Sequence, residues 1–126
     1  MELSLGFQRA SSAKQLFAQA DIISLHCPLT AETENIIDDE AIAAMKPTAI
    51  VINTSRGGTV DIDAVYRGLQ EAKICAAGLD VLPVEPLDRQ HPLFAAWTSQ
   101  EAWLEGRLIV TPHAAFYTPQ SLIDMR

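Results

Sequence analysis

Short apolar runs alternate along this chain with longer segments of helical character. The runs occupy residues 21–25, 49–52, 76–81 and 108–110. Two parallel strands need a crossover of about a dozen residues or more between them, usually a helix, and every gap between these runs is longer than that. The alternation of strand and crossover therefore predicts an α/β fold with one parallel sheet of about four strands and flanking helices, which is the Rossmann type of architecture.

Three polar side chains follow three of these runs. Arg56 comes after the second run, Glu85 after the third and His113 after the fourth. Parallel strands end at the same edge of a sheet, and open α/β sheets bind their ligands at that carboxyl edge. Neighbouring strands lie roughly 4.8 Å apart, so we expect the three side chains to face one small molecule.

The segments between the runs contain signals for helix starts. Ser11 or Ser12 is predicted to cap the first helix and Asp38 or Asp39 the second. Asp61 is predicted to cap a third helix, whose apolar positions recur at spacings of three and four. These positions are Ile62, Val65, Leu69 and Ala72. We interpret Asp61 and Asp63 as helix-start residues, because nothing nearby completes an oxygen cage for a metal ion, and we predict no metal site.

Length and charge narrow the possible classes of partner. A chain of 126 residues is predicted to form a single domain over residues 1–126. The net charge of −7, without a basic cluster, argues against nucleic acid and anionic membrane surfaces. No apolar run approaches the roughly 20 residues of a membrane span, so we expect a cytoplasmic protein.

Cys27 and Cys75 lack metal-ligand spacing, and we expect buried free thiols rather than a disulfide.

Four motifs resemble the D-isomer-specific 2-hydroxyacid dehydrogenase family in order and approximate spacing. They are residues 24–30, residues 45–58, Gly78-Leu79-Asp80-Val81 with Glu85-Pro86, and Thr111-Pro112-His113-Ala114-Ala115. Together they extend over nearly the whole chain. Within the family, residues 112–117 most resemble the branch that contains the C-terminal-binding-protein corepressors.

The resemblance implies hydride transfer between C2 of a small 2-hydroxy or 2-keto acid and the nicotinamide ring of NAD(P). His113 matches the residue that takes the hydroxyl proton, and Glu85 matches its partner carboxylate. Arg56 matches the residue that binds the substrate carboxylate, a task suited to the guanidinium fork.

The same resemblance assigns a set of residues to the cofactor. Asp80 matches the acid that contacts the nicotinamide carboxamide. Four further residues match positions that line the cofactor cleft, namely Cys27, Pro28, Thr54 and Ser55. The family's Gly-x-Gly-x-x-Gly turn, which holds the pyrophosphate, is not found among the six glycines of this sequence. We therefore expect a truncated nucleotide-binding domain that lacks the first βαβ unit, binds NAD(P) weakly or not at all, and is inactive alone.

Two classes of function stay open at this point. The chain is either a piece of a dehydrogenase that needs a complementing protein chain, or a non-catalytic module that associates with itself or binds another protein. In a doubly wound sheet, the run at residues 21–25 would be the fourth strand, next to a first strand that this sequence lacks. An unpaired edge invites another strand, so we expect a homodimer through this edge, with fold-back of Leu3-Ser4-Leu5 as the alternative.

Overall fold

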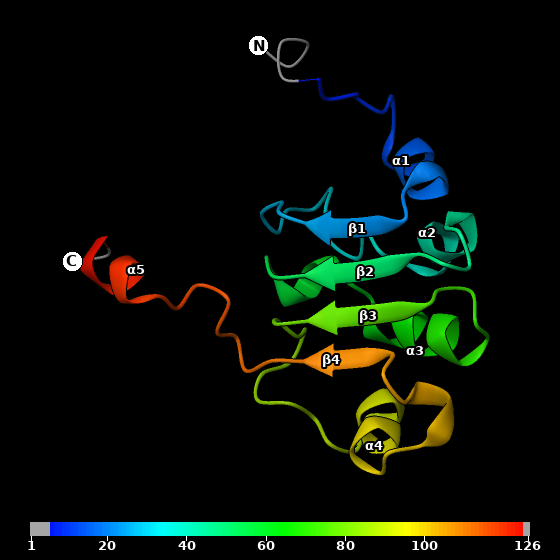
Figure 1. The fold of residues 1–126 in the computed structure, drawn as a ribbon, viewed down its shortest axis with the longest axis vertical. Coiled ribbons are helices and arrows are strands. Elements are labelled where there is room, and N and C mark those ends of the chain that lie inside the picture. Colours follow the sequence, from blue (N-terminus) through cyan, green and yellow to red (C-terminus); the bar gives the residue numbers. More distant parts are fainter. Residues whose placement is uncertain (1–5, 125–126) are drawn as a thin grey trace.

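A computed structural model describes residues 6–124 and contains one parallel sheet in this part of the chain. The sheet has the order β1-β2-β3-β4, so each strand pairs with the next one along the chain (Figure 1). Its strands are β1 (Ile22–Leu25), β2 (Ile50–Asn53), β3 (Ala76–Leu79) and β4 (Leu108–Val110). The prediction of a four-stranded parallel sheet with flanking helices is confirmed.

The strands match the apolar runs to within one or two residues, and the largest difference is at the end of β3. The run at residues 76–81 was predicted as one strand, but β3 ends at Leu79. The backbone of Asp80 still bonds on both sides: its N–H donates to the Asn53 carbonyl and its carbonyl accepts from the His113 N–H, both at 2.9 Å. The chain bends at this residue, and the Asp80 side chain binds the loop that follows β4.

The first three of the five described helices begin where the capping signals place them. They are α1 (Ala13–Gln19), α2 (Asp39–Ala44), α3 (Ile62–Gln70), α4 (Pro92–Thr98) and α5 (Pro119–Asp124), with short 3₁₀ turns η2 (Gly57–Thr59) and η3 (Ala102–Leu104). Ser12, Asp38 and Asp61 each accept a hydrogen bond from a backbone N–H in the first turn, as an N-cap should. The alternatives Ser11 and Asp39 are not the caps, whereas Asp61 is confirmed as a helix-start residue.

One face of the sheet forms the core. Alternate strand residues such as Ile23, Val51 and Leu79 are buried there, and α2 and α3 lie behind the sheet in Figure 1. Val65 and Leu69 of α3 are fully buried, as the helical spacing predicts. Ala72 was predicted to share their face, but this is wrong. The helix ends at Gln70, and Ala72 is an exposed residue with φ of 55°.

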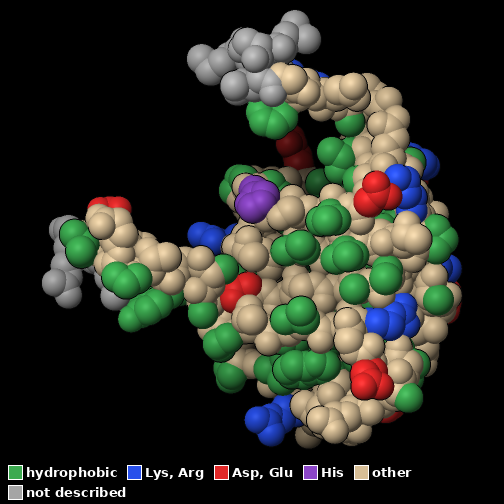
Figure 2. Space-filling view, viewed as in Figure 1, with side chains coloured by type: hydrophobic (Ala, Val, Ile, Leu, Met, Phe, Trp, Pro, Cys, Tyr) green, Lys and Arg blue, Asp and Glu red, His purple; other side chains and the backbone are tan. Residues whose placement is uncertain are grey.

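The opposite face of the sheet is bare. Ile22 of β1 and Ile109 of β4 are 61% and 65% exposed, and Ile50 and Ile52 of β2 are partly exposed. Figure 2 shows hydrophobic side chains scattered across this face of the molecule. β1 forms one edge of the sheet, as predicted for the run at residues 21–25. The Leu3-Ser4-Leu5 segment lies outside the described residues.

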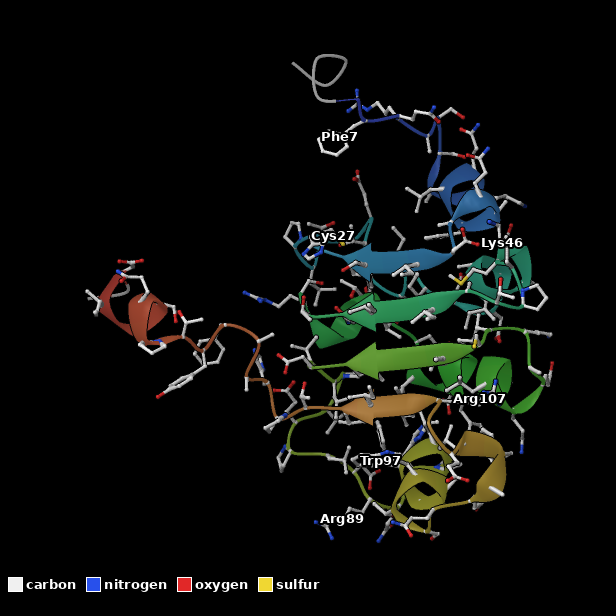
Figure 3. All side chains as sticks on the ribbon, viewed as in Figure 1. Phe7, Cys27, Lys46, Arg89, Trp97 and Arg107 are labelled. Atoms are coloured by element: carbon white, nitrogen blue, oxygen red, sulfur yellow. The ribbon has the colours of Figure 1, made fainter. Side chains whose placement is uncertain are left out.

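Both cysteines are free, but the expectation of buried thiols is wrong. Cys27 is half-buried in the loop beyond β1 (Figure 3), and Cys75 is exposed. Cys75 directly precedes the first residue of β3, so it lies at the amino edge of the sheet and outside the strand. Within residues 6–124, no helix has the length and apolar character needed to cross a membrane.

Candidate active site

The three side chains that follow strands all lie beyond the carboxyl edge of the sheet, and two of them are in contact. Nδ1 of His113 lies 2.9 Å from Oε2 of Glu85, with the two side chains 47% and 39% exposed. The sequence predicted this pairing by resemblance, across 28 positions of the chain. Because an ionised carboxylate can only accept, Nδ1 carries a proton in this contact, and in the neutral imidazole Nε2 is then the acceptor.

Glu85 is held as a carboxylate from two sides. The hydrogen bond from His113 is the main reason that the pKa of Glu85 lies below its usual value, and the Leu82 N–H, donating to Oε1 at 2.9 Å, acts in the same direction. Partial burial and the negative charge of Asp80 oppose this shift without reversing it. A carboxylate fixed in this way orients the imidazole ring.

Asp80 binds the loop on which His113 lies. Its carboxylate accepts hydrogen bonds from the Thr111 hydroxyl and from the N–H groups of Ala114 and Ala115, the latter two at 2.9 Å. Burial is the largest single influence on the pKa of Asp80 and raises it, but these three hydrogen bonds and the nearby His113 together hold it below its usual value. Asp80 is therefore an anion fastened to residues 111–115.

A buried amide organises the loop that contains Arg56, and the sequence analysis missed it. Asn53 is fully buried at the end of β2. Its Nδ2 donates to the Arg56 carbonyl at 2.9 Å and to the Thr59 hydroxyl at 3.2 Å, and its Oδ1 accepts from Ser55. The available signal was an amide directly after an apolar run, where a polar group entering the core needs partners.

Arg56 lies at the same edge but is not joined to the His113 and Glu85 pair by any hydrogen bond or ion pair within residues 6–124. Its side chain is exposed, and Nη1 donates to the Ser55 carbonyl at 2.7 Å. An exposed guanidinium at the mouth of a site is available to a carboxylate from solution. Of the three predicted residues, His113 and Glu85 are therefore in contact, and Arg56 is separate from them.

A cavity of about 430 Å³ adjoins the pair. Leu87, Val110 and Trp97 form much of its apolar wall, and Trp97 lies on α4 (Figure 3). The polar lining residues are Asp80, Glu85, Thr111 and His113. A mostly apolar cavity with a few convergent polar groups is the usual form of a small-molecule site. Trp97 is a second residue of this site that the sequence analysis did not select.

The residues predicted to line a cofactor cleft differ in their exposure to solvent and in whether their side chains already have hydrogen-bond partners within the chain. Pro28 and Thr54 are exposed in the loops after β1 and β2, Cys27 is half-buried, and Ser55 donates from its hydroxyl to Asn53 at 2.9 Å. Asp80 is 6% exposed and its carboxylate is occupied by the 111–115 loop. Among the described residues, no group of three or more His, Cys, Asp or Glu side chains is arranged to hold a metal ion.

Comparison with known proteins agrees with this architecture. Residues 2–115 match the family model described as D-isomer specific 2-hydroxyacid dehydrogenase, NAD binding domain. A glyoxylate reductase from Aeropyrum pernix is 40% identical over 114 residues, which is 90% of this chain and 31% of that protein. The chain therefore belongs to the D-isomer-specific 2-hydroxyacid dehydrogenase family.

Solved structures extend the match to three dimensions. The apo form of D-mandelate dehydrogenase from Rhodotorula graminis superposes with a TM-score of 0.82 at 28% identity, covering 98% of this chain and 33% of that one. The NAD-complexed D-isomer specific 2-hydroxyacid dehydrogenase from Lactobacillus delbrueckii ssp. bulgaricus gives 0.76 at 33% identity, covering 91% and 36%. The chain thus spans about a third of the length of these relatives.

Proposed function

We propose that the carboxyl edge of this sheet provides the acid–base pair and the substrate anchor of an NAD-dependent D-2-hydroxyacid dehydrogenase. The observation that supports this most directly is the contact between His113 and Glu85 beside an apolar cavity. An orienting carboxylate on one ring nitrogen leaves the other free to act on a substrate, which is the arrangement that general acid–base catalysis requires. The substrate proposed is a small 2-hydroxy or 2-keto acid.

Each residue then has one task. Nε2 of His113 takes the proton of the substrate hydroxyl as the acid is oxidised and returns it in the reverse direction, while Glu85 stabilises the imidazolium. Arg56 binds the substrate carboxylate, for which its exposed fork is suited. When NAD is bound, its nicotinamide supplies the hydride acceptor or donor.

The described residues fit the nicotinamide end of the cofactor only in part. Cys27, Pro28 and Thr54 are the accessible members of the predicted set, while Ser55 and Asp80 have partners within the chain. The sequence contributes no glycine-rich turn for the pyrophosphate. We therefore propose that this chain binds NAD(H) no more tightly than about millimolar, the scale of a few weak contacts. Calorimetry that gave micromolar affinity would contradict this.

The carboxylate anchor is tested with oxalate, a planar dicarboxylate that mimics a 2-oxo acid. Oxalate titrated into the labelled chain is expected to shift the NMR signals of Arg56, Glu85 and His113, and Arg56→Ala is expected to abolish the shifts. Arg89→Ala removes an exposed arginine of the loop before α4 (Figure 3) and serves as the matched control. Equal shifts in the parent chain and in Arg56→Ala would sink the proposed anchor.

Activity gives the second test. With NADH and glyoxylate, hydroxypyruvate or pyruvate, we expect no detectable turnover by this chain alone. The carboxyl edge of the sheet cannot by itself enclose the substrate, exclude water and orient the reacting groups. A complementing protein chain would then be needed for catalysis. Turnover that disappears in His113→Ala would refute inactivity while supporting the assigned role of His113.

A second candidate function is a non-catalytic module that associates with itself or binds another protein. The bare face of the sheet, with Ile22 and Ile109 more than half exposed, favours it. We propose a homodimer through the β1 edge as the form of that association. The oxalate titration separates the two candidates, because a module without a catalytic site gives no Arg56-dependent shifts.

A further inference from the structure

We propose that Asp80 is the positioning residue that holds the His113 ring against Glu85. This inference rests on the proposed function, because it concerns how the acid–base pair of that site is assembled. It assigns to Asp80 a task within the protein, whereas the family resemblance assigns this carboxylate to the cofactor.

The first support is the number and direction of the hydrogen bonds that Asp80 makes. Its carboxylate accepts from Thr111, Ala114 and Ala115, on both sides of His113 in the sequence. Its backbone carbonyl accepts from the His113 N–H at 2.9 Å. Asp80 therefore binds the loop before, at and after the histidine, while its own N–H is fixed to the end of β2.

The second support is the backbone conformation of His113. Its φ of 53° lies in the left-handed region, which a residue with a side chain rarely adopts. A conformation of this kind is strained and persists when the surrounding bonds hold it in place. The bonds from Asp80 supply that determination, because they pin the N–H groups of the three successive residues 113–115.

The third support is that Glu85 is held independently. Its Oε1 accepts from the Leu82 N–H, a bond within its own segment that does not involve the 111–115 loop. Removal of the Asp80 carboxylate should then move His113 and leave Glu85 in place. The pair would separate, although neither of its members had been changed.

The test measures the pKa of Glu85 in Asp80→Asn by carboxyl NMR, with the chain as it is and without any substrate. The charged and titratable groups that act on Glu85 are His113, which lowers its pKa, and Asp80, which raises it. Loss of the Asp80 charge alone would therefore lower the pKa of Glu85. Loss of the His113 hydrogen bond raises it toward 4.5, and this rise is the expected result.

Controls separate positioning from folding and from charge. Asp63→Asn makes the same change of charge at a side chain that is 63% exposed and should leave Glu85 unaffected. Thr111→Val keeps the Asp80 charge and removes one of its three hydrogen bonds, so a smaller rise is expected there. Thr111→Ser restores the hydroxyl and should return the parent value. The Thr111 pair keeps the test decisive where Asp80→Asn fails to fold.

A fall or no change in the pKa of Glu85 in folded Asp80→Asn would overturn the proposal. If Asp80→Asn does not fold, an unchanged pKa in Thr111→Val overturns it instead. Neither result touches the oxalate titration, because that experiment reads the substrate anchor at Arg56. Failure of the positioning role and failure of the proposed function are therefore seen in different measurements.

Discussion

At the scale of single residues, the close approach of two loops requires glycine at position 57. A Cβ at this position would lie 1.9 Å from the carbonyl oxygen of Leu82 and 2.1 Å from its carbon. These atoms are backbone, so they cannot rotate away. The glycine after Arg56 thus allows the loop following β2 to lie against the segment that leads to Glu85.

Gly57→Ala is therefore expected to lower the free energy of unfolding by at least about 1–3 kcal/mol, the usual cost of overpacking. Gly78→Ala is the matched control, since its Cβ would meet nothing closer than Ile52 at 4.0 Å. Alanine replaces glycine in a strand at no cost, or with a gain of up to roughly 1 kcal/mol. Urea unfolding of both variants measures the contrast, and equal midpoints would contradict it.

Asn53→Ala tests the buried amide that supports the Arg56 loop. The change leaves the Ser55 N–H without its partner and removes one of the three donors to the Arg56 carbonyl, which Thr59 still bonds, so we expect a loss of about 1–3 kcal/mol in the free energy of unfolding. Ser24→Ala removes an exposed hydroxyl that bonds His26 and should stay within about 0.5 kcal/mol of the parent. Thermal unfolding of the two variants provides the comparison.

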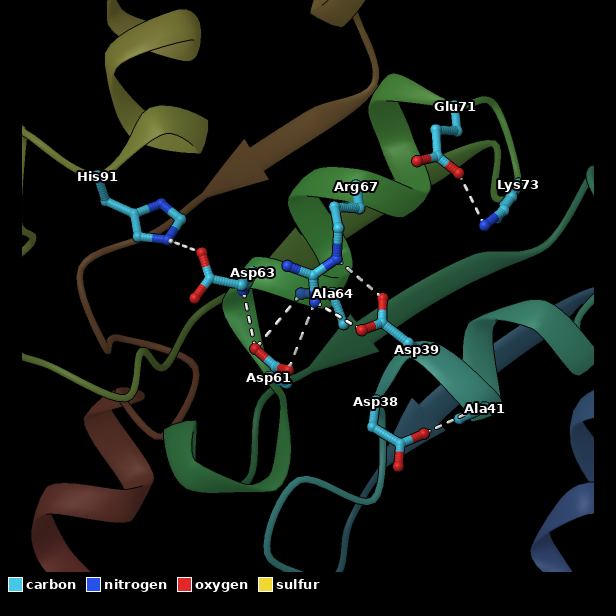
Figure 4. A network of polar contacts seen from close by, with 10 residues as sticks. All are labelled: Asp38, Asp39, Ala41, Asp61, Asp63, Ala64, Arg67, Glu71, Lys73 and His91. Carbon is cyan, nitrogen blue, oxygen red and sulfur yellow. Dashed lines mark hydrogen bonds and ion pairs between the residues drawn. The ribbon is translucent and has the colours of Figure 1, made fainter.

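At the scale of elements, polar contacts join the helices that cover the buried face (Figure 4). Arg67 of α3 donates from Nε and Nη2 to the two carboxylate oxygens of Asp39 on α2, at 3.0 and 2.6 Å. His91, the N-cap of α4, accepts from the Leu93 N–H through Nδ1 and lies 3.0 Å from Asp63 of α3 through Nε2. Three helices are thereby held in register by contacts outside the core.

The pair of Arg67 and Asp39 makes a prediction for pH. The hydrogen bond from Arg67 lowers the pKa of Asp39 below 3.8, so the stabilisation is fully present above pH 3.8 and is lost as the pH falls through the lower folded-state value. Arg67→Gln should raise the pKa of Asp39 toward 3.8, as followed by carboxyl NMR. Lys14→Gln, which breaks the exposed pair with Glu40, is the control, and an unmoved Asp39 in Arg67→Gln would count against this account.

At the scale of the whole molecule, the sequence predicted what depends on local pattern. The apolar runs located all four strands, Ser12, Asp38 and Asp61 were among the predicted caps, and the parallel order followed from the crossovers. The contact between His113 and Glu85 was reached through family resemblance, because a separation of 28 residues leaves no periodic signal.

The remaining features depend on tertiary contacts that no local pattern records. The bonds from Asp80 to residues 111–115 were not predicted, since they exist only once β3 and β4 are paired. Asn53 gave no distinct signal for the same reason. Cys75 was predicted to be buried because it adjoins an apolar run. Such a run indicates a buried strand but does not show at which residue the strand begins.

The β1 edge and the bare face of the sheet make the prediction for assembly. β1 pairs with β2 on one side only within the described sheet, so backbone groups of Ile22 and Ser24 point away from it. Unpaired strand edges next to exposed apolar side chains favour pairing with another strand. We therefore expect a dimer in which two copies of this edge meet across a two-fold axis.

Ile22→Lys is designed to oppose that association, because a charged side chain on an edge strand blocks pairing and position 22 is already 61% exposed. The variant should keep its fold and be monomeric at concentrations where the parent chain is dimeric by light scattering. Ile123→Lys, an equally exposed change on α5 away from the sheet, should leave the dimer intact. A parent chain that stays a monodisperse monomer at high concentration would rule out the dimer, and a dimer that survives Ile22→Lys would place its interface elsewhere than β1.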